Sequence, residues 1–470
     1  MIHQLETDYL VIGAGAMGMA FSDVIMTESN ATIVLVDKHD RPGGHWNVSY
    51  PFVRLHQPSS FYGVNSRKLG NDTKDATGWN QGLYELASGT EVVTYFEQVM
   101  QQQFLPTDRV RYFPMCEFQS AGTFSCLVSG KKYAVKVNRK TVDSTYMNVT
   151  VPAMSEPSFE LEPEVTCVPL NDIPGLHSRG TRFEKYIVIG AGKTGMDAAL
   201  WLLRNDVDPD HIIWIMPRVS WMLDRKNIQP GPDFMGSTLV GAANELEAIA
   251  QSESVEDLFA RVNKCGQLLR MDEDIQPTMY RCATVTEMEL KQLRRIAHIV
   301  RKGRVKRIEA DKIILEKGMV ETSLNNLHIN CTADGLERRP VAPVFDGDQM
   351  TLQTVRTCQQ VFSAAFIAHI ELTYEDETQK NDLCTVVPHP NTDLDFLRTT
   401  LGHHLNQARW AQLPELQKWL QIARLDGFTR TDEEIAALPE SAHEPLAKLM
   451  GNATQATERL QQLLAEIDRN

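Results

Sequence analysis

The stretch YLVIGAGAMG at residues 9–18 decides the fold of this chain, because it places three glycines directly after a short apolar run. Gly13 allows a tight turn, Gly15 lets the backbone approach a phosphate group, and Gly18 lets a helix pack closely on a strand. A helical stretch and a second apolar run at residues 32–36 follow. The pattern therefore predicts strand, turn, helix and strand, with the helix N-terminus facing bound phosphates.

The residue that ends the second apolar run points to a dinucleotide as the ligand. Asp37 lies 24 residues beyond Gly13, where an acidic side chain accepts hydrogen bonds from the hydroxyls of an adenosine ribose. A Gly-x-Gly-x-x-Gly motif alone is weak evidence, because a glycine-rich turn can have other causes. With a strand on each side and the acid in place, dinucleotide binding is the favoured function.

The same pattern recurs near the middle of the chain. The apolar run YIVI at residues 186–189 leads into GAGKTG at residues 190–195, and a helical stretch and an apolar run at residues 212–215 follow. Two such units are much more specific than one and predict two dinucleotide sites. We expect the second site to use the backbone and the first helical turn of Gly190, Gly192, Lys193, Thr194 and Gly195.

The stretch at residues 37–46 resembles a known family. An acid, five residues, Gly-Gly, one residue and Trp is similar to the second FAD motif of the flavin-containing monooxygenases, in which the glycines lie beside the cofactor. The family usually has Glu where this chain has Asp37. Two dinucleotide units, FAD first and nicotinamide second, resemble the flavoproteins that include these monooxygenases. The resemblance implies FAD contacts at Gly13, Gly15, Gly18, Asp37, Lys38, Gly44, His45 and Trp46.

The end of the second unit indicates which nicotinamide cofactor it binds. Its last strand is followed by Met-Pro-Arg, with no acid where NAD specificity would require one. An arginine just past this strand can pair with the 2′-phosphate of NADP. Arg218 is the first choice for this role and Arg225 the second, so NADPH is favoured over NADH.

The resemblance implies an α/β fold with two Rossmann-type dinucleotide-binding domains in a glutathione-reductase-like FAD/NAD(P) arrangement. We place the FAD-binding domain at residues 1–180 and 328–404, and the NAD(P)H-binding domain inserted into it at residues 181–327. Helical spacing predicts a helical insertion at about residues 235–301. Residues 405–470 are expected to form a helical C-terminal tail.

Four smaller signals complete this organisation. Thr286 and Glu289 form a capping box at a helix start, and alternating residues at 304–320 predict strands joined by short turns. Residues 170–183 are similar to the family's first crossover between domains, but they are too short for the Baeyer–Villiger fingerprint. In the segment similar to the second crossover Thr332 fits the family pattern and the usual Tyr is missing.

Two neighbouring residues, about ten positions beyond Trp46, are expected to take part in the chemistry. His56 lies over the family's Asn or His and Gln57 over its Thr, so the resemblance implies that both contact the flavin ring. The implied activity is NADPH-dependent oxygenation of a nitrogen or sulfur atom of a small molecule, with molecular oxygen forming a flavin C4a-hydroperoxide. Two alternatives stay open: a flavin oxidoreductase that inserts no oxygen, and an FAD-binding sensor protein without turnover.

Charge and hydropathy limit the partners and the cellular compartment that we expect for this chain. A formal net charge of -14 repels nucleic acid over most of the surface. No apolar run approaches the roughly 20 residues needed to span a bilayer, so we expect a cytoplasmic protein without membrane attachment. A monomer and a homo-oligomer both stay open as assemblies of this chain.

The eight cysteines contain no Cys-x-x-Cys pair and no metal-ligand spacing. We therefore expect reduced, mostly buried thiols and no metal site. The same scatter argues against a disulfide reductase, because that chemistry needs two close cysteines. His403 and His404 are adjacent, so they point apart on a helix and do not suit a metal either.

Overall fold

The first glycine motif lies in a mixed sheet. The computed structural model describes residues 2–154, 156–333 and 335–469. At the centre of this sheet, β1 (Ile2–Ile12) runs parallel to both of its neighbours, β2 and β6. The strand order is β19-β20-β6-β1-β2-β3, with β4 and β5 as an added hairpin; their bounds are β2 (Ile33–Val36), β3 (Val110–Phe113), β4 (Cys116–Ser120), β5 (Thr123–Cys126), β6 (Lys132–Asp143), β19 (Phe345–Asp346) and β20 (Gln349–Thr351).

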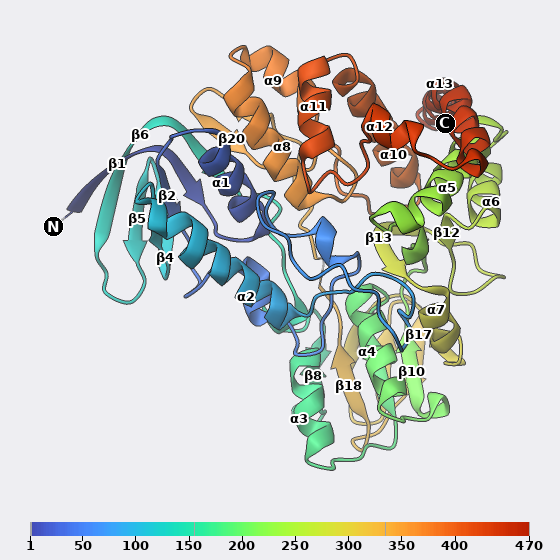
Figure 1. The fold of residues 1–470 in the computed structure, drawn as a ribbon. Coiled ribbons are helices and arrows are strands. Elements are labelled where there is room, and N and C mark those ends of the chain that lie inside the picture. The colour runs from blue at the N-terminus through green and yellow to red at the C-terminus, as the bar shows by residue number, and fades with distance from the viewer. Residues whose placement is uncertain (1, 155, 334, 470) are drawn as a thin grey trace.

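Two apolar helices form the core next to this sheet. α1 (Ala16–Glu28) and α8 (Gln360–Thr373) pack side by side (Figure 1). Both are buried along most of their length, because each is apolar on nearly all of its faces. The first glycine turn is therefore fixed between a buried strand and a buried helix, as the sequence predicts.

The second glycine motif belongs to a separate parallel sheet, in the lower lobe of Figure 1. Here β9 (Tyr186–Ile189) leads directly into α4 (Lys193–Arg204), so the second predicted unit of strand, turn, helix and strand is confirmed. The strand order is β14-β10-β9-β18-β8. The residue ranges of the other four strands are β8 (Cys167–Pro169), β10 (Ile212–Ile215), β14 (His298–Val300) and β18 (Leu327–Asn330).

Two strands of this sheet come from segments that the sequence analysis placed elsewhere. β18 pairs with β9, whereas the predicted boundary assigns residues from 328 onward to the first domain. β14 pairs with β10, whereas the helical insertion was predicted to reach about residue 301. β18 is the buried strand that the apolar run from Leu327 predicts, and only its sheet differs from the expected one. β14 has three residues, which is too short for a periodicity of two to show.

The predicted strands at residues 304–320 are confirmed as an antiparallel set. β15 (Val305–Ile308), β16 (Lys312–Leu315) and β17 (Gly318–Glu321) pair in sequence order, and the short strand β7 (Glu160–Leu161) adds to β15. Ile308 and Ile313 turn inward and are fully buried, whereas charged side chains of this sheet stay at its surface. The set therefore packs on the outer side of the second sheet as a separate layer.

The helical insertion is interrupted by strands. Its helices are α5 (Pro232–Ala250), α6 (Val255–Lys264) and α7 (Glu287–Leu293). α7 starts at the predicted capping box, since the Thr286 hydroxyl accepts the Glu289 N–H and the Glu289 carboxylate accepts the Thr286 N–H. Between these helices lies a three-stranded sheet that the sequence analysis missed, made of β11 (Ser220–Asp224), β12 (Leu268–Leu269) and β13 (Met279–Val285).

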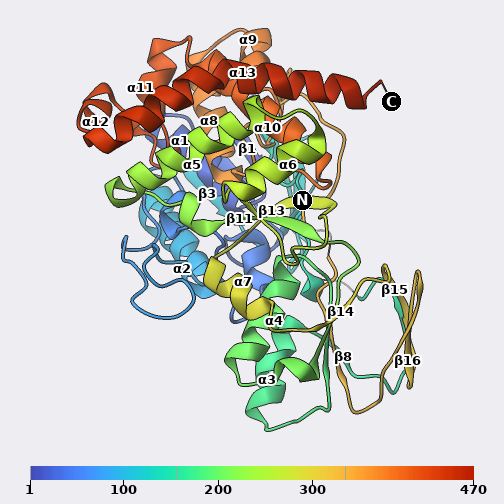
Figure 2. The ribbon, with the colours of Figure 1, turned by 90° about the vertical axis from the view of Figure 1, so that its right-hand side faces the viewer.

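The C-terminal tail is helical, as predicted. Its longest helix, α13 (His443–Ile467), lies along α5 and next to α10 (Figure 2). Buried Leu460 and Leu463 of α13 pack with Leu258 and Phe259 of α6, so the tail covers the insertion. The remaining helices of this part are α9 (Glu377–Leu383), α10 (Leu394–Trp410), α11 (Pro414–Ile422) and α12 (Asp432–Ala436).

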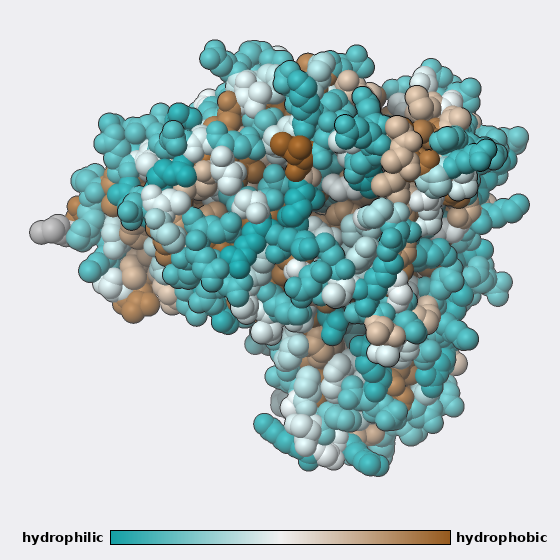
Figure 3. Space-filling view, viewed as in Figure 1, coloured by the Kyte–Doolittle hydropathy of each residue, from teal (hydrophilic) through white to brown (hydrophobic). Residues whose placement is uncertain are grey.

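The surface carries mainly polar residues. Figure 3 shows a largely hydrophilic face with scattered apolar side chains, in keeping with the net charge of -14. Among the helices of the described residues, none is both long enough and apolar enough to cross a bilayer.

One prediction about the cysteines is wrong. Cys282 of β13 and Cys358, two residues before α8, form a disulfide across 76 residues of sequence, with their Cα atoms 6.6 Å apart. Short cysteine spacings do not reveal this pair, because only the packing of the insertion on the first domain brings the two residues together. The other six cysteines are free thiols.

Buried neutral histidines are expected to make the protein sensitive to acid. Burial lowers the pKa of His404 to about 4, and burial together with the Arg281 charge does the same for His389. Because an unfolded histidine has a pKa near 6.5, the unfolded chain binds more protons between pH 6.5 and 4, and stability falls as pH falls through this window. We expect a loss of about 2 kcal/mol per histidine at pH 5.

Urea unfolding at pH 7.5 and pH 5 measures this loss. The unfolding midpoint should be clearly lower at pH 5, and His404→Gln should reduce the difference between the two midpoints. An unfolding midpoint that does not change between these pH values would contradict the burial of neutral imidazoles.

Candidate functional site

The first glycine motif forms a turn that admits no side chain at two positions. Gly13 has a φ of +96°, and a Cβ on it would lie 2.8 Å from the Ser144 Oγ. A Cβ on Gly18 would overlap the carbonyl oxygen of Gly13. α1 starts after Gly15 without a side-chain cap, so its first-turn N–H groups remain available to a ligand. The turn and helix start thus form a phosphate cradle.

Asp37 holds this turn in place. Its buried carboxylate accepts the Ala14 N–H through Oδ2 at 2.5 Å and the His39 N–H through Oδ1 at 2.7 Å. The predicted ribose-binding acid is therefore at the cradle, and in this structure it also fixes the cradle's backbone. Lys38, the next residue, is exposed at the rim.

The Gly-Gly-His-Trp segment lies against the first cradle. Gly43 and Gly44 both have positive φ, and a Cβ on Gly44 would lie 3.1 Å from the Gly15 Cα. The Trp46 Nε1 donates a hydrogen bond of 2.7 Å to the Tyr62 hydroxyl. Burial and the nearby His39 lower the pKa of His45 to about 4, so its imidazole is neutral at pH 7. The structure thus brings the predicted first-site residues together.

The second cradle repeats this geometry. Gly190 has a φ of +127° and would place a Cβ 2.8 Å from the Cys331 carbonyl oxygen, and a Cβ on Gly195 would overlap the carbonyl of Gly190. Gly192 is exposed with open space around its Cα, and α4 begins there without a side-chain cap. The backbone at Gly192 is therefore open to a phosphate group.

Side chains near the second cradle link it to the first domain. Lys193 forms an ion pair with Asp197 one turn along α4, and the Asp197 Oδ2 also accepts the Tyr50 hydroxyl at 2.5 Å. The Asn171 side chain donates to the carbonyls of Val48 and Ser49. The chain that leaves the first cradle therefore packs directly on the second one, and both dinucleotide sites face the same junction.

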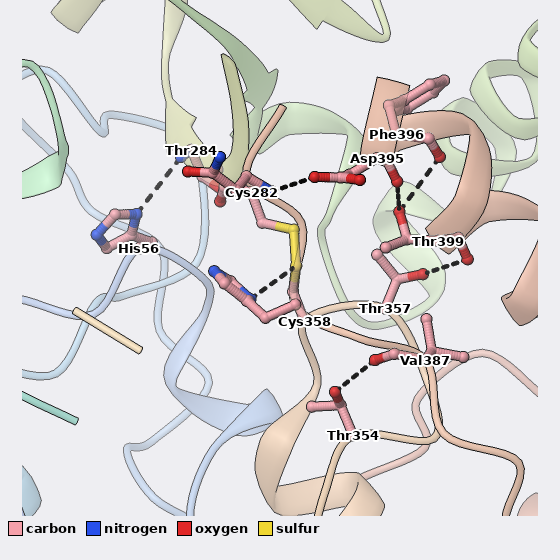
Figure 4. The surroundings of a disulfide bond; sticks show 12 residues. His56, Cys282, Thr284, Thr354, Thr357, Cys358, Val387, Asp395, Phe396 and Thr399 are labelled. Atoms are coloured by element: carbon pink, nitrogen blue, oxygen red, sulfur yellow. Dashed lines mark hydrogen bonds between the residues drawn. A yellow bond between two sulfur atoms is a disulfide. The ribbon is translucent and has the colours of Figure 1, made fainter. Parts of the chain in front are cut away.

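His56 lies at this junction as a neutral hydrogen-bond donor. Burial lowers its pKa far below the usual value, and the charges of Lys193 and Arg225 add to this effect. The Thr284 N–H donates to His56 Nδ1 at 3.4 Å (Figure 4), which leaves the ring proton on Nε2. Gln57 follows as a half-buried side chain.

Arg225, the second choice for a 2′-phosphate contact, is buried among protein partners. Arg225 is 3% exposed and pairs with Glu289 at 3.0 Å, and its other donors bind the His56 carbonyl and Asn80. A further Nη2 donor binds the Thr284 carbonyl, so this buried guanidinium joins the insertion to the first domain. The position of Arg225 along the chain does not reveal these partners, because they come from distant segments.

Arg218 and Thr332 lie at the strand ends where the sequence placed them. Arg218 follows β10, and its Nη2 donates to the Asn391 Oδ1 at 3.2 Å. The Thr332 hydroxyl donates to the Asn330 side chain at the end of β18, beside the strand that carries Gly190.

A cavity near the disulfide was not foreseen. Its volume is about 210 Å³, and its lining includes Arg281, Gln353, Arg339 and His389. The His389 Nδ1 lies 3.9 Å from the Cys358 Sγ. No sequence signal could have found this site, because its residues come from the insertion, the second crossover and the segments around α8. Among the described residues no group of three His, Cys, Asp or Glu side chains could hold a metal ion.

Comparisons with known proteins place this chain among relatives. Residues 11–56 match the family model described as an NAD(P)-binding Rossmann-like domain. Uncharacterised proteins of Mycobacterium tuberculosis and Mycobacterium bovis are each 52% identical over 469 residues, which covers 97% of this chain and 86% of theirs.

Solved structures give the fold. The polycyclic ketone monooxygenase of Thermothelomyces thermophila aligns with 98% of this chain and 88% of its own, at 11% identity and a TM-score of 0.52. A flavin-containing monooxygenase of Stenotrophomonas maltophilia aligns with 81% of this chain and 100% of its own, at 12% identity and a TM-score of 0.44. The first of these likenesses confirms the predicted fold class.

Proposed function

Because this chain belongs to the family of these mycobacterial proteins and joins two dinucleotide cradles, we propose that it is an FAD-dependent, NADPH-using monooxygenase. The proposed reaction oxygenates a nitrogen or sulfur atom of a small molecule by way of a flavin C4a-hydroperoxide. One observation carries the proposal: the segment that leaves the first cradle packs on the second and ends at His56. The two sites therefore face a common junction, as hydride transfer between two cofactors requires.

The residues present fit both cofactors. The uncapped start of α1 with the Gly13–Gly18 turn, and the uncapped start of α4 with the open backbone at Gly192, suit one pyrophosphate each. When bound, NADPH supplies a hydride and FAD supplies the electron carrier that reacts with oxygen. Lys193, at the start of α4, adds a positive charge close to these phosphates.

His56 is proposed to supply the hydrogen-bond donor that oxygenation needs. Its Nε2–H is free of the Thr284 bond, and its low pKa keeps the ring neutral, so it donates a proton in a hydrogen bond without releasing an acid proton. Gln57 is proposed as a second polar contact.

The disulfide favours a second candidate function. Cys282 and Cys358 lie close to the His56 segment, where electrons from a flavin would have an acceptor other than oxygen. This observation supports the flavin oxidoreductase that inserts no oxygen. The intact second cradle argues against a sensor protein without turnover, because such a protein has no need of NADPH.

The decisive experiment follows flavin and NADPH together. The purified protein should show a bound-flavin absorbance, and NADPH should bleach it both with and without oxygen. With oxygen and an amine or thioether substrate, product should form in proportion to the NADPH consumed. Hydrogen peroxide in place of product would favour the second candidate, and a colourless protein that takes up no FAD would overturn both.

Replacing His56 by alanine is expected to separate reduction from oxygenation. NADPH should still reduce the flavin at a rate within about tenfold of the unmodified protein, because both cradles remain. Peroxide release per NADPH should rise about tenfold or more, because the donor is lost. Stopped-flow reduction and a peroxide assay measure the two quantities. Unchanged peroxide release would remove His56 from the proposed chemistry.

Replacing Arg218 by alanine is expected to weaken the binding of NADPH more than the binding of NADH. A guanidinium that pairs with the 2′-phosphate contributes about 1.5–3 kcal/mol, which corresponds to at least a tenfold rise in KM for NADPH. The KM for NADH should change little, and Arg204→Ala, at the far end of α4, serves as a control. Equal effects on both cofactors would show that Arg218 does not read the 2′-phosphate.

A further inference from the structure

The disulfide joins the two parts of the molecule that the proposed reaction brings together. Cys282 lies in β13 of the insertion, and Cys358 lies just before α8 of the first domain. Figure 4 shows the bridge between the His56 segment on one side and Thr354 on the other. It is therefore a covalent connection across the junction between the domains.

The Cys358 side of this bridge belongs to the segment that follows β20, the last strand of the sheet with the first cradle. β1, β6 and β20 are parallel neighbours, so their carboxyl ends lie at one edge, where a bound dinucleotide lies in such sheets. The Ser144 hydroxyl after β6 donates to the carbonyl of Gly13, and Leu352 after β20 donates to the carbonyl of Asp143. The chain then continues through Cys358 into α8, which packs on α1.

The Cys282 side approaches the same region from the insertion. Thr284, two residues further along β13, donates its N–H to His56, the residue proposed to contact the flavin. The disulfide thus lies next to elements from both sides of the proposed flavin pocket. Both sulfur-bearing residues are half-buried, so neither is sealed in the core.

Local features differ from those of a plain structural bridge. Cys282 and Cys358 each have a φ of +55°, a left-handed conformation that residues with a side chain rarely adopt and that occurs preferentially at functional sites. The His389 Nδ1 lies 3.9 Å from the Cys358 Sγ, so its neutral ring can accept a hydrogen bond from a thiol at Cys358.

We propose that Cys282 and Cys358 form a redox centre that accepts two electrons from the reduced flavin. This inference rests on the proposed binding of FAD and NADPH. The S–S bond breaks, two electrons and two protons pass from the reduced flavin to the two sulfur atoms, and the flavin returns to its oxidised form. The products are two thiols, and the one at Cys358 can donate a hydrogen bond to His389.

The neighbouring cavity indicates what the dithiol can reduce in turn. Arg281, Arg338 and Arg339 line it together with Glu337, so cations outnumber anions among its described lining residues. A small disulfide that carries carboxylates matches this charge. Thiol–disulfide exchange would break the substrate S–S bond, release two substrate thiols and re-form the Cys282–Cys358 bridge.

The number of electrons taken up by the purified holoprotein tests the redox centre. In an anaerobic dithionite titration the unmodified protein should accept four electrons per FAD, two for the flavin and two for the disulfide. Cys358→Ser and, independently, Cys282→Ser should accept only two. Cys126→Ser should still accept four, because Cys126 lies in the distant β4–β5 hairpin.

Alkylation followed by mass spectrometry gives a readout that does not depend on turnover. Before NADPH is added Cys282 and Cys358 should resist alkylation, and after anaerobic addition both should be alkylated. Cys126, whose pKa is lowered to about 7 by hydrogen bonds from Ser129, should react in both states and serves as an internal control. The reduced protein should reduce glutathione disulfide, which carries carboxylates, at least tenfold faster than it reduces the cationic disulfide cystamine.

The outcomes separate this inference from the proposed function. A colourless protein would overturn the proposed binding of FAD itself. A flavin that NADPH bleaches, with uptake of two electrons and no new alkylation, would overturn only the redox centre. If dithiothreitol frees the two thiols and NADPH does not, the bridge is structural. Equal rates of reduction of glutathione disulfide and cystamine would overturn the assignment of an acidic substrate.

Discussion

Gly195→Ala is expected to abolish reduction of the flavin by NADPH and to leave the flavin bound. A Cβ at this position would overlap the carbonyl oxygen of Gly190, so α4 must move away from β9 and the second cradle opens. The first cradle lies in a different sheet and keeps its shape. We expect the reduction rate at a fixed NADPH concentration to fall at least about a hundredfold, which corresponds to about 2.7 kcal/mol of lost binding or orientation.

Two further glycines give matched controls for this experiment. Gly236→Ala, in α5, has open space around the new Cβ, so reduction should remain normal. Gly18→Ala makes the corresponding overlap with Gly13 in the first cradle and should yield a protein that purifies without flavin. Stopped-flow absorbance measures the reduction, and the flavin-to-protein absorbance ratio measures occupancy. Normal reduction by the Gly195→Ala protein would show that NADPH binds elsewhere.

Asp426→Ala is expected to cost about 3–5 kcal/mol of unfolding free energy. Asp426 is fully buried and pairs with the Arg356 guanidinium at 2.5 Å, and its other oxygen accepts the N–H groups of Phe428 and Thr429. Arg356 is 3% exposed and stacks over the ring of Phe362, so it cannot reach water when its partner is removed. An unpaired buried charge accounts for most of the predicted loss. Urea unfolding followed by circular dichroism measures it.

An exposed ion pair provides the comparison. Lys418 and Glu415 are 71% and 78% exposed, so Lys418→Ala should change the unfolding free energy by less than about 1 kcal/mol. Replacing both buried partners, Arg356→Met with Asp426→Leu, should recover much of the stability lost in the single variant, because no charge is left without a partner. If the double variant is as unstable as Asp426→Ala, packing and not charge explains the effect.

The parts of the fold that could be predicted from the sequence are those with local signals. Both glycine units have a strand, a turn and a helix within about 20 residues, and steric demands at Gly13 and Gly190 identify the turn wherever the unit occurs. The capping box at Thr286 is equally local. Each of these features depends on neighbours a few residues away.

The parts that were missed depend on contacts between distant segments. β14 is too short to show a period, and only its pairing with β10 in the second sheet makes it a strand. Arg225 lies near the expected place for a phosphate ligand, but packing of the insertion gives it Glu289 as a partner. The Cys282–Cys358 bridge has the same origin, since tertiary structure alone places these two residues together.

The strand order of the second sheet dictates a sequence of events during synthesis. β8 leaves the ribosome before β9 and β10, yet its only neighbour in the sheet is β18, which emerges more than 150 residues later. β8 therefore has no partner while the whole insertion is being made, and its edge is unprotected in the nascent chain. The core of the first domain also needs α8, which is synthesised late. Neither nucleotide-binding domain can therefore finish folding until most of the polypeptide has been translated.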